Sequence, residues 1–200
     1  MKKISWLRKF ESAFIIIFAF FYWYTTKQIF LVASFCLFFL FIFFDFYYSL
    51  SKGKSLLARI FFKLYPHKEE EVNRIISDPS LFFASIIAMT LLFSKEIVVL
   101  STILLFSVDA FEQIFGISFK GKSLPWNKNK TYIGTFTGFV AGIFFGFFSI
   151  YLLKMTIPYS IMIIASFAAA IGGTSSKFDN TLIHWLSALA IFSSYSVYLG

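Results

Sequence analysis

The chain has 200 residues, of which 58% are hydrophobic and only 14% are charged. A water-soluble protein of this length needs far more charge to cover its surface, so this composition excludes an ordinary soluble domain. We therefore expect an all-α, polytopic integral membrane protein built as a single domain over residues 1–200. The net charge of +8 does not call for a nucleic-acid partner, because lysine and arginine gather in the cytoplasmic loops of such proteins.

Apolar runs in the first half of the chain predict three transmembrane helices. A span needs about 20 predominantly apolar residues, and such runs cover approximately residues 10–26, 29–46 and 77–93. No small-residue cleavage site ends the first run, so we expect it to remain in the protein as a span. Before the third run, Asp78 and Pro79 form a helix-start signal, with Asp78 as the expected N-cap.

The polar stretch between the second and third runs contains an amphipathic pattern. Its apolar side chains recur at helical spacing and share one face, whereas Lys52, Arg59 and Lys63 fall elsewhere; the apolar residues are Leu56, Leu57, Ile60, Phe61 and Leu64. This pattern predicts a helix that lies on the cytoplasmic surface of the membrane.

Four more apolar runs follow, over residues 96–115, 131–153, 157–172 and 180–199, so we expect about seven spans. The run over 131–153 has a glycine at every fourth residue: Gly134, Gly138, Gly142 and Gly146. Small residues let another helix approach closely, so we expect a packing seam along this stripe. In the last run, His184 is expected to be a buried, hydrogen-bonded side chain. Cys36 is the single cysteine and can form no disulfide within the chain.

The distribution of positive charge predicts the orientation in the membrane. If the seven spans alternate in direction, only Lys27, Lys95 and Lys154 of the 18 Lys and Arg residues fall on one side, and the other 15 fall on the side of the N-terminus. Positively charged loops remain in the cytoplasm. We expect a multi-pass protein with its N-terminus inside and its C-terminus outside.

Two acids near the cytoplasmic end of the fourth run are the first candidates for chemistry. Asp109, Glu112 and Gln113 are spaced to share one helix face. Carboxylates are costly inside a membrane protein and usually mark a site. A carboxylate pair can hold Mg²⁺, and an aspartate beside a hydroxyl can take its proton. Asp109 could do either, and we expect Asp109 and Glu112 to be catalytic and metal-binding residues.

A basic loop follows these acids and suits a polyphosphate. Its lysines are Lys120, Lys122, Lys128 and Lys130. Such lysines could also be present because they keep the loop in the cytoplasm or bind anionic lipids. The segment Gly116 to Ser123 satisfies the pattern G-x-x-x-x-G-K-[ST]. A true P-loop follows a strand and opens a helix, whereas this one follows an apolar helix and meets Pro125, so we reject a P-loop NTPase. Its glycines can still expose backbone amides to phosphate.

The same stretch resembles the signature of the CTP-dependent lipid kinases, which include dolichol kinase, phytol kinase and the yeast-type diacylglycerol kinase. The matching pieces are Asp109-Ala110, Ile114-Phe115-Gly116, Lys120-Gly121-Lys122, Asn129-Lys130-Thr131 and Gly134-Thr135, with a further match from Phe178 to Leu182. The resemblance implies that CTP donates a phosphate, with Mg²⁺, to the hydroxyl of a membrane lipid alcohol. A polyprenol such as dolichol, a phytol-like alcohol and diacylglycerol are all open as acceptors.

The resemblance also implies a set of site residues. The nucleotide would contact Gly116, Lys120, Gly121, Lys122, Lys128, Lys130, Thr131, Gly134 and Asn180, and the metal would contact Asp179 as well as Asp109 and Glu112. Asp179 and Asn180 could instead simply cap the last helix. Family members carry an acid shortly before this Asp-Asn segment, whereas Gly172 to Ser176 contain none here. Glu112 could replace that acid.

Two other classes of function are compatible with parts of the sequence. A phosphatidate cytidylyltransferase also uses CTP at a membrane face, but its usual C-terminal signature is absent from this chain. A small membrane transporter would place its buried charges near mid-membrane, at discontinuous helices. Here the acids lie toward the cytoplasmic end of a span, which favours an enzyme.

Overall fold

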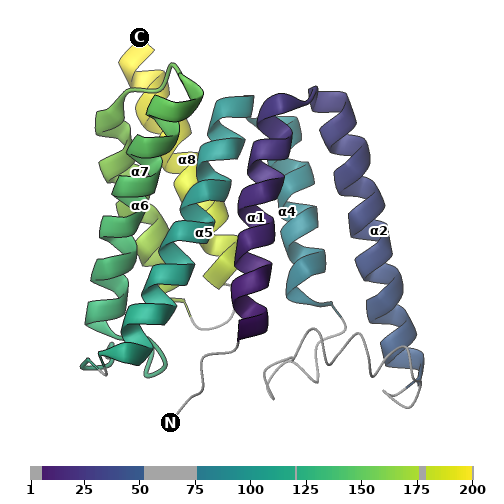
Figure 1. Ribbon diagram of the computed structural model, residues 1–200, viewed down its shortest axis with the longest axis horizontal. Coiled ribbons are helices and arrows are strands. Elements are labelled where there is room, and N and C mark those ends of the chain that lie inside the picture. Colours follow the sequence, from purple (N-terminus) through teal and green to yellow (C-terminus); the bar gives the residue numbers. More distant parts are fainter. Residues whose placement is uncertain (1–5, 52–75, 120, 176–178, 200) are drawn as a thin grey trace.

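The computed structural model describes residues 6–51, 76–119, 121–175 and 179–199, and these ranges form a helical bundle (Figure 1). Its helices are α1 (Trp6–Tyr24), α2 (Lys27–Ser51), α4 (Asp78–Leu92), α5 (Lys95–Ser118), α6 (Tyr132–Leu153), α7 (Tyr159–Gly173) and α8 (Asp179–Leu199). Each lies within a few residues of one of the seven expected apolar runs. The all-α prediction is therefore confirmed for the described part of the chain. The expected surface helix, from Leu56 to Leu64, lies outside the described residues.

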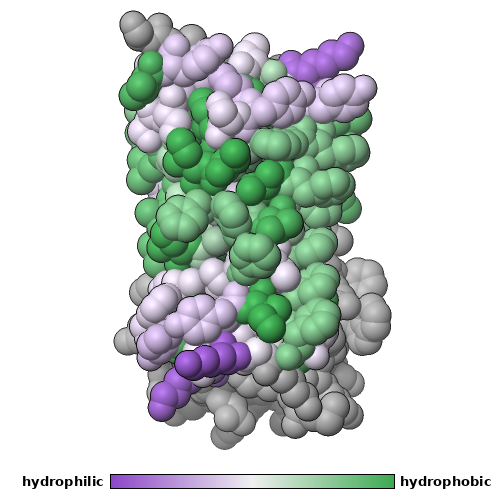
Figure 2. Space-filling model, turned by 90° about the vertical axis from the view of Figure 1, so that its left-hand side faces the viewer, coloured by the Kyte–Doolittle hydropathy of each residue, from purple (hydrophilic) through white to green (hydrophobic). Residues whose placement is uncertain are grey.

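Three of these helices are long and apolar enough to cross a bilayer: α2 over Lys27–Tyr47, α5 and α6. Two further helices, α4 and α7, are apolar but shorter, and the segment Phe14–Tyr24 of α1 is apolar as well. Figure 2 shows the matching surface, with a hydrophobic band between more hydrophilic ends. Exposed rings such as Phe136, Phe144 and Phe167 contribute to the apolar surface of α6 and α7. These features are those of a membrane protein.

Successive helices run in alternating directions, and α5 lies at the centre of the bundle (Figure 1). It packs against α1, α4, α6, α7 and α8, and its Val99, Leu100, Leu104 and Val108 are fully buried. Helix α2 lies at the edge and packs mainly against α4. We call the end of the bundle with residues 121–131 the loop end. The turn end is the opposite one, with connections at Thr25, Ser94 and residues 154–158.

The expected glycine seam of α6 is confirmed. A Cβ on Gly138 would lie 2.9 Å from the carbonyl oxygen of Val108 in α5, and one on Gly146 would lie 2.8 Å from Sδ of Met162 in α7. The stripe therefore lets α6 approach two neighbouring helices more closely than any larger residue would allow. This close approach brings the first turn of α6 against the last turns of α5.

The start of α4 differs from the prediction. Ser77, with φ −78° and ψ 160°, is the N-cap, and Asp78 is already helical, so the prediction of Asp78 as the cap is wrong. The reason lies in α2, which supplies another carboxylate. Oδ2 of the buried Asp45 accepts bonds from Ser77 N at 2.9 Å, Ser77 Oγ at 2.9 Å and Ser80 Oγ at 2.6 Å. The acid that satisfies this helix start is thus contributed by a neighbouring helix.

The prediction for His184 is confirmed. The ring is fully buried, with Nδ1 3.3 Å from Ser85 Oγ and Nε2 3.1 Å from Thr102 Oγ1. Thr102 Oγ1 also donates to Val98 O at 2.7 Å, so each ring nitrogen lies within hydrogen-bonding distance of a buried hydroxyl group. The histidine links α8 to α4 and α5 as a satisfied core residue.

Candidate functional site

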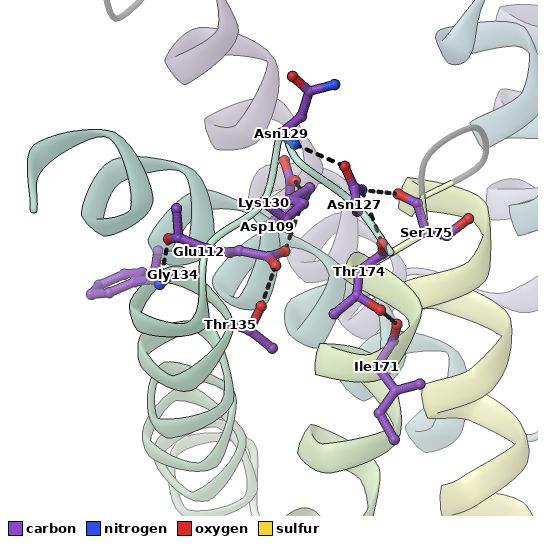
Figure 3. Close-up of polar contacts among 12 residues, drawn as sticks. Asp109, Glu112, Asn127, Asn129, Lys130, Gly134, Thr135, Ile171, Thr174 and Ser175 are labelled. Carbon is purple, nitrogen blue, oxygen red and sulfur yellow. Dashed lines mark hydrogen bonds and ion pairs between the residues drawn. The ribbon is translucent and has the colours of Figure 1, made fainter. Parts of the chain in front are cut away.

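The candidate site lies at the loop end, where α5, α6, the end of α7 and the loop over residues 121–131 meet around Glu112 (Figure 3). The Glu112 side chain is only 1% exposed. Lys130 Nζ donates to its Oε2 at 3.0 Å, and Thr135 Oγ1 donates to its Oε1 at 2.9 Å. Both carboxylate oxygens are therefore hydrogen-bonded, as a buried charge requires. We call Glu112, Lys130, Thr135 and Gly173 the Glu112 cluster.

Asp109 lies one helical turn before Glu112 and faces the same lysine. Its Oδ1 is 3.8 Å from Lys130 Nζ, and its side chain is 27% exposed, against 16% for Lys130. The ammonium group of Lys130 thus lies beside two carboxylates from the same helix. Of these two, Asp109 is the one that a ligand can reach from outside.

Two glycines make the close packing around Glu112 possible. A Cβ on Gly173, at the end of α7, would lie 2.6 Å from Glu112 Oε2. A Cβ on Gly134, in the first turn of α6, would lie 2.6 Å from the carbonyl oxygen of Glu112. Real Cβ atoms do not approach other atoms so closely, so a larger residue at position 134 would have to displace the backbone of α5, and one at position 173 would have to displace the Glu112 carboxylate. Gly134 N also donates to Oγ1 of Thr131, the N-cap of α6, at 3.1 Å.

The loop between α5 and α6 is folded rather than open. Leu124 N donates to Lys130 O at 2.9 Å, and Tyr132 N donates to Lys122 O at 3.1 Å, which pairs the two halves of the loop. The buried Asn127 donates through Nδ2 to Thr174 O at 2.9 Å and Ser175 O at 3.2 Å. The loop is consequently fastened at two points, to Glu112 in α5 and to the chain after α7.

The structure brings some of the predicted site residues together and places others apart. Asp109, Glu112, Lys130, Thr131 and Gly134 converge at the loop end, and a Cβ on Gly116 would lie 3.1 Å from Thr131 Oγ1. Gly121 packs against the side chain of Ile133. Lys122 and Lys128 are exposed on the loop. Lys120 lies outside the described residues, as do the side chains of Asp179 and Asn180 at the start of α8.

Sequence analysis missed three residues of this site. Thr135 entered only through the matching piece Gly134-Thr135 and was given no role in the site. Gly173 has no local signal that distinguishes it from other small residues of an apolar helix. Asn127 does have one, because its Oδ1 accepts from Asn129 N at 3.0 Å. That bond is an Asx turn, which the spacing Asn-x-Asn in a polar loop could have indicated.

The acids of this site can contribute to a magnesium site but do not form one alone. Within the described part of the chain, no three His, Cys, Asp or Glu side chains come close enough together to hold a metal ion. Mg²⁺ often binds through one or two carboxylates and completes its shell with substrate phosphates and water. A reachable carboxylate such as Asp109 is compatible with that mode of binding.

Comparison with known proteins finds a distant relative of this chain and no matching family model. No protein-family model matches it, and no solved structure matches it. An uncharacterized protein of Rickettsia prowazekii (strain Madrid E) is 27% identical to it over 145 residues, which are 72% of this chain and 68% of that protein. This similarity carries no activity with it, so the function must be argued from the site.

Proposed function

We propose that this protein is a membrane-embedded kinase that transfers the γ-phosphate of a nucleotide, CTP, to the hydroxyl group of a lipid alcohol. The observation that carries the proposal is the position of Lys130 beside Asp109 and Glu112 at one end of an apolar helix. Phosphoryl transfer depends on positioned positive charge and on a group that orients or deprotonates the acceptor. A cation and a reachable carboxylate supply these two elements.

The location of the site supports a reaction between a water-soluble donor and a lipid acceptor. The Glu112 cluster lies at the loop end, and apolar side chains cover the flanks of α6 and α7 below it. A nucleotide would reach this end from water, with Lys122 and Lys128 exposed on the adjoining loop. A lipid alcohol would reach it from the bilayer with its tail beside the helices.

The topology that we propose has seven spans with the loop end in the cytoplasm. Successive described helices alternate in direction (Figure 1). If every connection follows this alternation, 15 of the Lys and Arg residues fall on the side of the loop end and three fall on the other side. The positive-inside rule then orients the loop end toward the cytoplasm. CTP is available there, which is consistent with the proposed donor.

In the proposed reaction, the chain's own residues Asp109 and Lys130 assist a direct transfer of phosphate from the nucleotide to the lipid. The hydroxyl oxygen of the lipid forms a bond to the γ-phosphorus, and the bond from that phosphorus to the β–γ bridging oxygen breaks. CDP leaves with the electron pair. Asp109 either accepts the proton of the hydroxyl group or would hold Mg²⁺ together with the phosphates, in which case the proton passes to water. When bound, Mg²⁺ would neutralise part of the negative charge on the phosphates. Lys130 offsets the negative charge of the transferred group.

The decisive test is nucleotide consumption by the purified protein in lipid–detergent micelles. CTP or ATP labelled at the γ or at the α position would be supplied with Mg²⁺ and a panel of polyprenol, phytol and diacylglycerol. We expect γ-label, and no α-label, in one lipid, with CTP preferred. Appearance of α-label in a lipid would instead identify a cytidylyltransferase. If the folded protein transfers neither label to any lipid, the kinase proposal is wrong.

A further inference from the structure

We propose that Lys130 is the cation that contacts the transferred phosphoryl group, and that Glu112, Thr135 and Gly173 are positioning residues that hold it. This inference rests on the proposed function and assigns different roles within the same site. In it, Glu112 acts through Lys130 and does not touch the metal ion or the substrate. The assignment follows from burial, from the fixed orientation of the Glu112 carboxylate, and from the anchoring of the Lys130 backbone.

Burial separates the two acids into different roles. The Glu112 side chain has almost no exposed surface, and both of its oxygens already accept hydrogen bonds from protein donors. A ligand that reached Glu112 would have to displace Lys130 or Thr135 and leave a buried polar group without its partner, which is unfavourable. Asp109 and Lys130 keep exposed surface, so these two can meet an incoming phosphate and its metal ion.

The Glu112 carboxylate is held at both of its oxygens. Thr135 Oγ1 donates to Oε1 at 2.9 Å, and Lys130 Nζ donates to Oε2 at 3.0 Å. A Cβ on Gly173 would lie 2.6 Å from Oε2, and one on Gly138 would lie 3.3 Å from Glu112 Cβ, so the backbones of α7 and α6 lie close to this side chain. A rigid acceptor in this place determines where the ammonium group lies.

The backbone of Lys130 is held as firmly as its head group. Its N–H donates to Asn127 O at 3.1 Å, and its carbonyl oxygen accepts from Leu124 N at 2.9 Å. Asn127 is in turn bonded to the chain after α7. A lysine side chain anchored at both ends is preorganised, so its charge requires little rearrangement when negative charge develops in the transition state. This distinguishes Lys130 from the exposed Lys122 and Lys128.

Reactivity of the lysine amine tests the contact with phosphate directly and without a measurement of activity. The folded protein would be treated briefly with an amine-acylating reagent, with and without Mg²⁺ and CTP, and modification at each lysine would be measured by mass spectrometry. We expect Mg²⁺ and CTP to slow modification of Lys130 at least fivefold. Glu112→Gln, which keeps the shape of the side chain but removes its charge, should make Lys130 in the free protein react faster than in the wild type.

Turnover tests the positioning roles, with a matched pair of isosteric variants. Thr135→Val removes the donor to Glu112 Oε1, and we expect kcat to fall about tenfold or more while the KM for the lipid stays constant. Thr137→Val removes a hydroxyl of the same helix that bonds only to backbone carbonyls, and its kcat should stay within about twofold of the wild type. Thermal unfolding of both variants would verify that they are folded.

The possible outcomes separate this inference from the proposed function. If the wild type transfers phosphate but CTP does not protect Lys130, the kinase stands and the role of Lys130 is wrong. If Lys130 is protected but Thr135→Val and Glu112→Gln retain full kcat, the positioning roles are wrong. If no phosphate is transferred to any lipid, the proposed function itself fails, whatever the labelling shows.

Discussion

At the scale of single residues, Asp109 and Glu112 were predictable because each is an acid in an otherwise apolar helix, where a carboxylate is costly. Their difference was not predictable. Helical spacing places both on one face, but only the packing of α6 and α7 shows that Glu112 is enclosed and Asp109 is reachable. In the same way, the loop lysines look equivalent in the sequence, but of the three that the structure describes, Lys122 and Lys128 are exposed and Lys130 contacts the two acids.

The replacement Asp109→Asn is the sharpest test of a residue in the proposed reaction. It preserves size and leaves a reachable polar group, so the fold should remain intact. Loss of a proton acceptor or metal ligand should lower kcat by about 100-fold or more. Steady-state phosphorylation of the lipid acceptor would measure this.

A carboxylate at the turn end provides the control for Asp109→Asn. Glu96 accepts hydrogen bonds from Thr156 N and Oγ1, so Glu96→Gln weakens a contact of the fold far from the site. We expect this control to affect thermal stability more than kcat. An Asp109→Asn protein with wild-type kcat would remove Asp109 from the mechanism.

At the scale of helices, apolar runs located all seven described helices, because a long hydrophobic stretch has few other structural solutions. The glycine stripe of α6 also predicted a seam. What the sequence did not contain is which helices share the seam, since contacts between α5, α6 and α7 depend on how the whole bundle is arranged. The bond from Asn127 to the chain after α7 was unpredictable for the same reason.

The replacement Gly138→Ala tests the seam as an element of the site. Its Cβ would lie 2.9 Å from the backbone oxygen of Val108, and backbone yields less readily than a flexible side chain. We expect a loss of about 1–3 kcal/mol in the free energy of unfolding, with an accompanying loss of activity because Glu112 packs against the same glycine. Reversible unfolding in mixed micelles would measure the change.

A variant on the exposed side of the same helix is the comparison for Gly138→Ala. Val140 is largely exposed, so Val140→Ala should alter the free energy of unfolding by no more than about 0.5 kcal/mol. If both variants lower the free energy of unfolding equally, the two faces of α6 are equally sensitive to substitution. The seam would then not determine how closely α5 and α6 pack.

At the scale of the whole molecule, the proposed topology places Lys122 and Lys154 on opposite sides of the membrane. Both side chains are exposed, and each can be replaced by cysteine after the single Cys36 has been changed to serine. A membrane-impermeant maleimide should label Lys154→Cys in intact cells and should label Lys122→Cys only after the membrane is opened. These results follow from alternating helices combined with the retention of positive loops in the cytoplasm.

The orientation experiment also constrains the reaction. If Lys122→Cys is labelled in intact cells, the loop end faces away from the cytoplasm, and a cytosolic nucleotide could not reach Lys130 or Asp109. The kinase proposal would then fail even though the Glu112 cluster remained intact. Labelling of both cysteines from outside would mean that the chain crosses the membrane an even number of times between residues 122 and 154, which is incompatible with α6 as a single span. The expected pattern supports both the seven-span topology and a site that opens to cytosolic CTP.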